Sequence, residues 1–124
     1  MSKTVYTTNA PAAIGPYSQA VIAGNMVYTS GQIAINPLSG NVEASDICGQ
    51  TEQVCENLST VLKAAGTSLS KVVKTTCYLR NMEDFALFNE VYGKYFTEKP
   101  ARSCVAVREL PKNVLVEVDA VAEL

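Results

Sequence analysis

The residues best suited to chemistry lie near the end of the chain, at Arg102 and Glu117. Arg102 follows Pro100-Ala101 at the start of a predicted strand, where a rigidly held guanidinium matches a planar anion, usually a carboxylate. Glu117 lies in the middle of the last predicted strand, and a carboxylate there can orient a water molecule and accept its proton. On residue type alone, a solvated surface arginine is the commoner case. The pair fits a site that binds an anion and activates water.

The sequence of 124 residues contains no histidine, which limits the catalytic machinery that it can carry. Ser-His-Asp and Cys-His nucleophile systems are excluded, and so are most zinc sites. The four cysteines form no Cys-x-x-Cys pair, and without a secretory signal we expect reduced thiols and no metal: Cys48, Cys55, Cys77 and Cys104. Any catalysis must therefore use carboxylates, arginine, tyrosine, hydroxyls, thiols, backbone groups or water.

Length and composition predict one soluble domain over residues 1–124. Hydrophobic residues make up 48% of the chain, which is enough for a packed core. We expect a cytoplasmic protein without a membrane partner, because there is no signal peptide and no apolar run approaches the roughly 20 residues of a membrane span. A formal net charge of -2 and a pI of about 5.1 argue against nucleic acid as a partner.

Hydrophobic periodicity and turn residues predict the order strands, helix, strand, helix, strands. Ser45-Asp46 starts the first helix and Gly66 ends it. Asn81 is expected to cap the second helix, with Asp84 in its first turn. This order predicts an α+β fold with two helices on one face of a mostly antiparallel sheet. The predicted strands cover residues 4–7, 19–23, 26–34, 71–80 and 114–124, and a further strand begins at Arg102.

The last predicted strand alternates between two faces. Its even-numbered positions are wholly apolar and should lie beneath the helices: Val114, Val116, Val118, Ala120 and Ala122. Its odd-numbered face mixes the carboxylates of Glu117 and Asp119 with Leu115 and Val121. That face carries too many carboxylates to be buried in a hydrophobic core and too many apolar residues to be fully exposed to solvent. It suits a subunit interface lined by a polar pocket.

Four further positions each allow a structural and a functional interpretation. Tyr17 follows the restrained turn at Pro16, although such a tyrosine is more often a core or interface aromatic. Gly31 interrupts a predicted strand, which indicates a bulge, a close approach by another group, or a twist point. Cys104 has no histidine to activate it, so packing is favoured over a nucleophilic role. Asn89 lies on the second helix, where a solvated side chain is the default.

Three motifs resemble those of the Rid family, the reactive intermediate deaminases: Ala12-Ala13-Ile14-Gly15-Pro16-Tyr17-Ser18-Gln19, Thr29-Ser30-Gly31-Gln32-Ile33 and Pro100-Ala101-Arg102-Ser103-Cys104-Val105. The likeness runs the length of the chain and is strongest to the RidA subgroup. It implies a chorismate-mutase-like fold and a homotrimeric barrel with sites in the clefts between subunits. It also implies cofactor-free hydrolysis of 2-imino acids, such as 2-iminobutanoate and 2-iminopropanoate, to 2-keto acids and ammonia, which protects pyridoxal-phosphate enzymes.

The resemblance also implies roles for the residues at matching positions. The arginine that binds the substrate carboxylate corresponds to Arg102, and the glutamate that orients the hydrolytic water corresponds to Glu117. The tyrosine after Gly-Pro corresponds to Tyr17, and the serine of the Ser-Gly-Gln motif to Ser30. The substrate-binding positions that complete the set are Gly31 and Cys104, through backbone groups, and the helical Asn89.

Two other functions stay open at this stage. Some proteins of this fold are thought to act as ligand-sensing or regulatory trimers, and a ribonuclease or translation-inhibitor role is attributed to some family members. The acidic pI and the absent histidines count against the ribonuclease. Turnover of a freshly generated imine distinguishes a deaminase from a protein that only binds its ligand.

Overall fold

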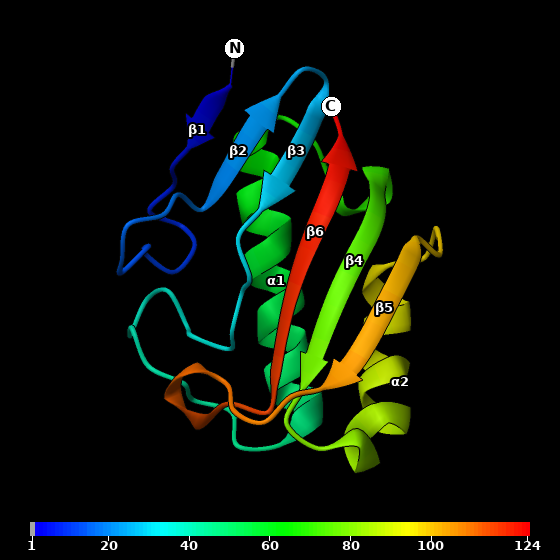
Figure 1. Cartoon of the computed structure of the whole chain (residues 1–124). Helices are drawn as coiled ribbons and strands as arrows, with labels where there is room; N and C mark the ends of the chain where they lie inside the picture. Colours follow the sequence, from blue (N-terminus) through cyan, green and yellow to red (C-terminus); the bar gives the residue numbers. More distant parts are fainter. Residues whose placement is uncertain (1) are drawn as a thin grey trace.

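The computed structural model describes residues 2–124, which form a six-stranded sheet with two helices on one face (Figure 1). Every neighbouring pair of strands is antiparallel except β4 and β5, which are parallel because α2 (Phe85–Tyr95) connects them across the sheet. The predicted α+β fold with a mostly antiparallel sheet is confirmed. In spatial order the strands are β1 (Lys3–Val5), β2 (Ala20–Ala23), β3 (Met26–Thr29), β6 (Val116–Glu123), β4 (Val72–Leu79) and β5 (Ala101–Ala106).

The longer helix, α1 (Ile47–Ala65), begins and ends where the sequence predicts. The Asp46 carboxylate accepts a hydrogen bond from the backbone N–H of Gly49, which satisfies one of the free donors at the helix start. Gly66 adopts a φ of 92° at the other end, a left-handed conformation that glycine reaches without steric cost. The apolar stripe of α1 is fully buried against the sheet through residues such as Val54 and Leu58.

The start of α2 differs from the prediction. Asn81 does not cap the helix, because a single 3₁₀ turn (Met82–Asp84) intervenes and the Asn81 side chain makes no capping hydrogen bond. The turn is closed instead by the backbone, where the Asp84 N–H donates to the Asn81 carbonyl oxygen. The α-helix proper starts at Phe85, and it buries Phe88 and Tyr92.

The two faces of β6 are confirmed. All five even-numbered residues from Val114 to Ala122 are buried beneath the helices, whereas Leu115, Glu117, Asp119 and Val121 are only partly covered on the opposite, open face of the sheet. Because side chains of a strand alternate, one strand supplies both the centre of the core and a row of carboxylates outside it.

The strand predicted from Met26 to Ala34 is too long, since β3 ends at Thr29. The ladder to β6 breaks there and resumes only as an isolated bridge between Gln32 and Val118. The break leaves room beside Gly31 for a side chain from β6, and it creates the cavity described below. Within residues 2–124, no helix combines the length and the apolar character needed to span a membrane.

Candidate functional site

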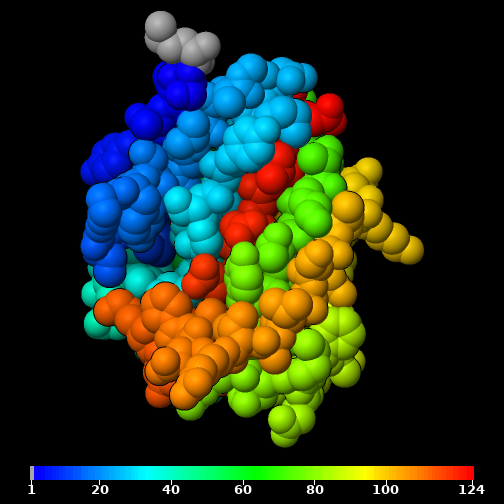
Figure 2. Space-filling view, in the orientation of Figure 1, coloured from blue at the N-terminus to red at the C-terminus, as the bar shows by residue number. Residues whose placement is uncertain are grey.

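A cavity of about 460 Å³ opens where β3 ends and β6 begins. Four residues singled out from the sequence line its polar side: Tyr17, Ser30, Gly31 and Glu117. The segment that precedes β6, orange in Figure 2, lies at the foot of the sheet beside the loops that follow β1 and β3. The opposite wall of the cavity is apolar and comes from these loops: Pro11, Ala12, Ile14, Ile33, Ile35 and Pro111.

Gly31 and Glu117 are in direct contact across the broken ladder. A Cβ atom added to Gly31 would lie 2.2 Å from the Glu117 Oε2 atom, so no larger residue fits while the carboxylate keeps its place. Of the alternatives raised by the sequence, the close approach is therefore the correct one. Burial raises the pKa of Glu117, and the negative charge of Asp119 raises it further. A carboxylate with a raised pKa is a better proton acceptor than an ordinary surface glutamate.

Ser30 and Tyr17 are held by backbone contacts on the other side of the cavity. The Ser30 hydroxyl donates a hydrogen bond of 2.5 Å to the Ser18 carbonyl oxygen, which ties the end of β3 to the segment before β2. The Tyr17 N–H donates to the Gly15 carbonyl oxygen at 2.8 Å, so the turn at Pro16 is tight, as the sequence predicts. Tyr17 is 51% exposed. It is therefore not a core aromatic, and it remains available at the cavity mouth.

Two buried amides that sequence reasoning missed fix the walls of this cavity. Gln19 holds the loop after β1: its Oε1 accepts from the Thr7 N–H at 2.7 Å, and its Nε2 donates to the Thr7 and Pro11 carbonyl oxygens. Each of its hydrogen bonds is made to backbone that would otherwise lack a partner. The side chain is almost fully buried and therefore cannot be exchanged for an apolar one without orphaning these groups.

Asn57 of α1 also fixes a wall of the cavity through hydrogen bonds to backbone. Its Nδ2 donates to the carbonyl oxygens of Ile33 at 3.1 Å and Ile35 at 2.9 Å, and it is only 1% exposed. Both isoleucines belong to the apolar wall. A sequence signal existed, because Asn57 interrupts the apolar helical stripe that runs through Val54 and Val61, and a polar residue in such a stripe usually has a buried partner.

A second cluster forms between β5 and α2. The Arg102 Nη1 donates a hydrogen bond of 2.8 Å to the Asn89 Oδ1, a contact that the sequence did not predict, although both residues were candidates. The guanidinium carbon lies 4.9 Å from the centre of the Tyr92 ring and within 6 Å of the rings of Phe85 and Phe88. Such stacking on aromatic faces holds a guanidinium in place while leaving its other N–H groups free to donate.

Cys104 lies two residues further along β5, in register with Cys77 of β4. Burial raises the pKa of the Cys104 thiol, and it raises the pKa of Cys77 to about 12. A thiol that stays protonated is a poor nucleophile. The packing interpretation of the Cys104 side chain is therefore supported.

The two clusters lie on opposite faces of the sheet. Arg102 pairs with Thr75, which is fully buried on the helix-covered face, whereas Glu117 pairs with Tyr78 on the open face. Side chains of directly paired residues point to the same side of a sheet. The chain by itself therefore brings Tyr17, Ser30, Gly31 and Glu117 together, but it does not bring Arg102 to them.

The structure thus defines a class of protein: a small α+β domain with a polar cavity at a break in its sheet and a guanidinium displayed beside the edge strand. A family model described as Endoribonuclease L-PSP matches residues 7–124, and the chain belongs to this family, which includes the Rid proteins. The 2-iminobutanoate/2-iminopropanoate deaminase of Escherichia coli K12 is 49% identical over 126 residues, covering 98% of each chain.

Other relatives carry different names. A protein of Lactococcus lactis named "Putative regulator AldR" is 50% identical over 123 residues, again covering 98% of each chain. The crystal structure of YyfA from Yersinia pestis, described as a protein of unknown function of the conserved Rid family, superposes with a TM-score of 0.97. It is 44% identical and is matched over 100% of both chains. These relatives share the fold and the family of this chain but carry different names.

Proposed function

We propose that this protein hydrolyses reactive 2-imino acids, such as 2-iminobutanoate and 2-iminopropanoate, to 2-keto acids and ammonia, and that it thereby protects pyridoxal-phosphate enzymes. The observation that carries the proposal is the Glu117 carboxylate, whose pKa is raised and which lies against Gly31 in a cavity of suitable size. The name of the Escherichia coli relative supports the same reaction. We also propose that it acts in the cytoplasm, the location expected from its sequence.

The chemistry needs only groups that this chain supplies. A water molecule held by Glu117 attacks the C2 carbon, its proton passes to the carboxylate, and the π electrons of the C=N bond move to nitrogen. Glu117 then returns the proton to the nitrogen. Ammonia leaves with the electrons of the C–N bond as the C2 hydroxyl gives its own proton to Glu117 and becomes the keto group, and Glu117 passes this proton to solvent. An iminium is already electrophilic, so the reaction as written requires no cofactor. Positioning of water and substrate supplies most of the acceleration.

Arg102 is the group that we assign to the substrate carboxylate. Its planar fork can donate two parallel hydrogen bonds to that group, and the three aromatic rings fix its orientation in advance. Asn89 holds one of its N–H groups and so orients the fork. The backbone N–H groups of Gly31 and Cys104 are assigned to the carboxylate and to the reacting imine, and the hydroxyls of Tyr17 and Ser30 complete the polar wall.

Because Arg102 and Glu117 lie on opposite faces of one sheet, a complete site requires a second subunit. We propose a homotrimer of the chorismate-mutase-like type, in which the Arg102 cluster of one subunit meets the Glu117 cavity of the next. The open face of the sheet supports this assembly, since it exposes large apolar residues such as Tyr28 and Val105 beside its carboxylates. A closed threefold ring would cover the same surface on every subunit.

The direct test is a coupled assay. Threonine dehydratase generates the imine, and the release of 2-oxobutanoate is timed with and without the purified protein, while sedimentation measures its mass. Faster release from a trimer is the expected result. Binding of 2-oxobutanoate without any acceleration would favour a ligand-binding regulatory trimer, and cleavage of RNA by protein free of contaminating nucleases would favour a ribonuclease. A monomer at micromolar concentration would contradict the site between subunits.

Mixing two inactive variants tests that site directly. Arg102→Ala and Glu117→Gln should each lose activity. When the two variants are unfolded and refolded together, half of the subunits supply an intact Arg102 and the other half an intact Glu117. About a quarter of the sites between subunits should then contain both groups and be active. The measurement is imine turnover of the mixture beside each variant refolded alone. Activity of the mixture no higher than that of the separate variants would show that both residues act within one subunit.

Gly31→Ala tests the contact with Glu117. The new Cβ atom would force the Glu117 carboxylate to move, because it would lie 2.2 Å from Oε2. We expect a folded protein whose imine turnover falls about tenfold to a hundredfold, the usual effect of misplacing a reacting group. Gly93→Ala on α2 is the matched control, since nothing lies within 4 Å of its added Cβ atom. Normal turnover in Gly31→Ala would show that the reaction does not depend on the position of the Glu117 carboxylate.

A further inference from the structure

Lys112 lies in a turn where the backbone favours glycine. It follows Pro111 with a φ of 54°, and the Asn113 N–H donates to the Leu110 carbonyl oxygen at 3.1 Å, which makes Lys112 the third residue of a turn of type II. The Val114 N–H donates to the Pro111 carbonyl oxygen at 3.3 Å, so a second turn overlaps the first. The second turn has a positive φ at both of its central residues, 54° at Lys112 and 58° at Asn113. An L-residue pays a steric cost for that conformation, which glycine would avoid.

The strained turn places Lys112 at the candidate site. Lys112 lines the main cavity and also an adjoining cavity of about 220 Å³, which shares Pro11, Ala12, Ile14 and Ile35 with it. Among the described residues that line the main cavity, only Lys112 carries a positive charge and only Glu117 carries a negative one. Strained backbone at a non-glycine residue is commonest where the side chain has a function that outweighs the cost.

Negative charge near this cavity opposes the approach of an anionic substrate. The open face of β6 presents the carboxylates of Glu117 and Asp119, and both would repel an incoming α-carboxylate. Within one subunit no arginine belongs to the described lining of the cavity. Arg102 lies on the other face of the sheet, and Arg80 lies close by, where its Nη1 donates to the Asn113 carbonyl oxygen at 3.3 Å. Lys112 is the cation of the described cavity lining that can attract the anion before it reaches its final position.

We propose that Lys112 is a substrate-steering residue, which draws α-carboxylate anions into the cavity beside Glu117 and is kept in a strained turn for that purpose. The proposal rests on the function proposed above and adds a role that Arg102 does not perform. Arg102 orients the bound carboxylate through a fixed fork, whereas a lysine acts as a mobile point charge on a flexible stem. Loss of Lys112 should therefore weaken capture of the anion and leave the chemical step intact.

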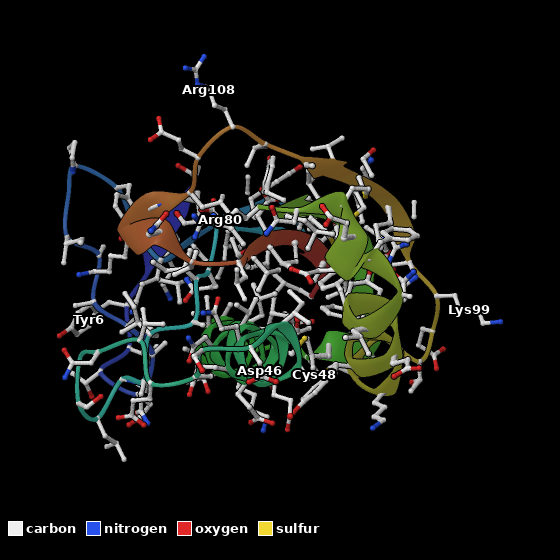
Figure 3. All side chains as sticks on the ribbon, turned by 90° about the horizontal axis from the view of Figure 1, so that it is seen from below. Tyr6, Asp46, Cys48, Arg80, Lys99 and Arg108 are labelled. Carbon is white, nitrogen blue, oxygen red and sulfur yellow. The ribbon has the colours of Figure 1, made fainter. Side chains whose placement is uncertain are left out.

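The test compares four variants: Lys112→Gly, Lys112→Gln, Lys112→Arg and the control Lys99→Gly. Lys99 has a φ of 53°, lines neither cavity and points away from the rest of the molecule (Figure 3). Both glycine variants should melt about 2–4 °C higher than the wild type, because each relieves a left-handed backbone. The dissociation constant for 2-oxobutanoate should rise about threefold at low salt in Lys112→Gly and Lys112→Gln, but not in Lys99→Gly.

Two measurements distinguish electrostatic steering by Lys112 from a structural role: the salt dependence of binding, and the recovery of binding when the charge is kept in Lys112→Arg. The threefold difference should shrink at high salt, since mobile ions screen exposed charges, and Lys112→Arg should restore the wild-type affinity. Turnover of imine at saturating supply should fall little in any of the four variants. Unchanged 2-oxobutanoate binding in Lys112→Gln, a salt-independent loss, or a Lys112→Arg variant as weak as Lys112→Gln would each overturn the proposal. If the wild-type protein hydrolyses no imine, the proposed function fails, while these binding measurements still decide the role of Lys112.

Discussion

Arg102→Ala is expected to abolish nearly all imine hydrolysis while the protein remains folded and assembled. A bidentate grip loses two charge-assisted hydrogen bonds, each worth roughly 1.5–3 kcal/mol, and the orientation of the substrate is lost as well. Turnover should therefore fall by well over an order of magnitude. Arg102→Lys keeps the charge but not the fork, so it should also be badly impaired. The measurement is 2-oxobutanoate release beside a melting curve and a sedimentation run.

The stability of the Arg102 variants should change little. The guanidinium is only partly buried and stacks on three aromatic rings, which contributes about 0.5–1 kcal/mol at such sites. Arg108→Ala is the matched control, because Arg108 is exposed and points away from the body of the molecule (Figure 3). Near-normal turnover in Arg102→Ala would end the assignment of Arg102 to the carboxylate. Loss of activity in Arg108→Ala as well would point to a general effect of removing positive charge.

Glu117→Gln is expected to lower activity and to raise stability at the same time. The amide cannot accept a proton from water, so imine hydrolysis should fall about a hundredfold or more. The pKa of Glu117 is raised from 4.5 in the folded protein by burial and by Asp119, so ionising this group at neutral pH opposes folding. Replacing it with a neutral amide removes that cost. The variant should melt higher than the wild type at pH 7.

The stability gain of Glu117→Gln has a definite pH dependence. A carboxyl group with a raised folded pKa favours the folded state only while it is protonated, and this contribution is lost as the pH rises through the folded value. The melting temperatures of wild type and variant should therefore converge below the ordinary glutamate pKa of 4.5 and diverge above it. Melting curves from pH 4 to pH 8 check this, and a variant less stable at pH 7 would contradict the burial of a charged Glu117.

Asp119→Asn is the control for the catalytic part of this prediction. Asp119 lies two residues away on the same face, and its charge raises the pKa of Glu117. Asp119→Asn should therefore stay active and lose activity at a lower pH than the wild type does. If the acid limb of the pH–rate profile did not move, the titrating group would be one other than Glu117.

The sequence by itself determined the features that are local to one element. The two faces of β6 follow from alternation along a single strand, so the burial of Val116 and Val118 could be predicted without knowing any partner strand. The ends of α1 follow from Asp46 and Gly66 for the same reason, because a cap acts only on its own helix. The three motifs likewise fixed the family before the fold was known. The contact of Gly31 was one of three alternatives that the sequence offered.

The tertiary structure decided what depends on pairing between distant segments. Whether Arg102 shares a face with Glu117 is set by the register of β5 on β4 and of β4 on β6, and the sequence contains no local signal for either register. The break after Thr29 depends on Glu117 filling the gap, and the burial of Asn57 depends on two carbonyl groups more than 20 residues away. The positive φ of Lys112 also appears only in the folded chain, since a Pro-Lys pair alone does not select a type II turn. Local patterns thus fix which residues face outward, and long-range pairing fixes which of them meet.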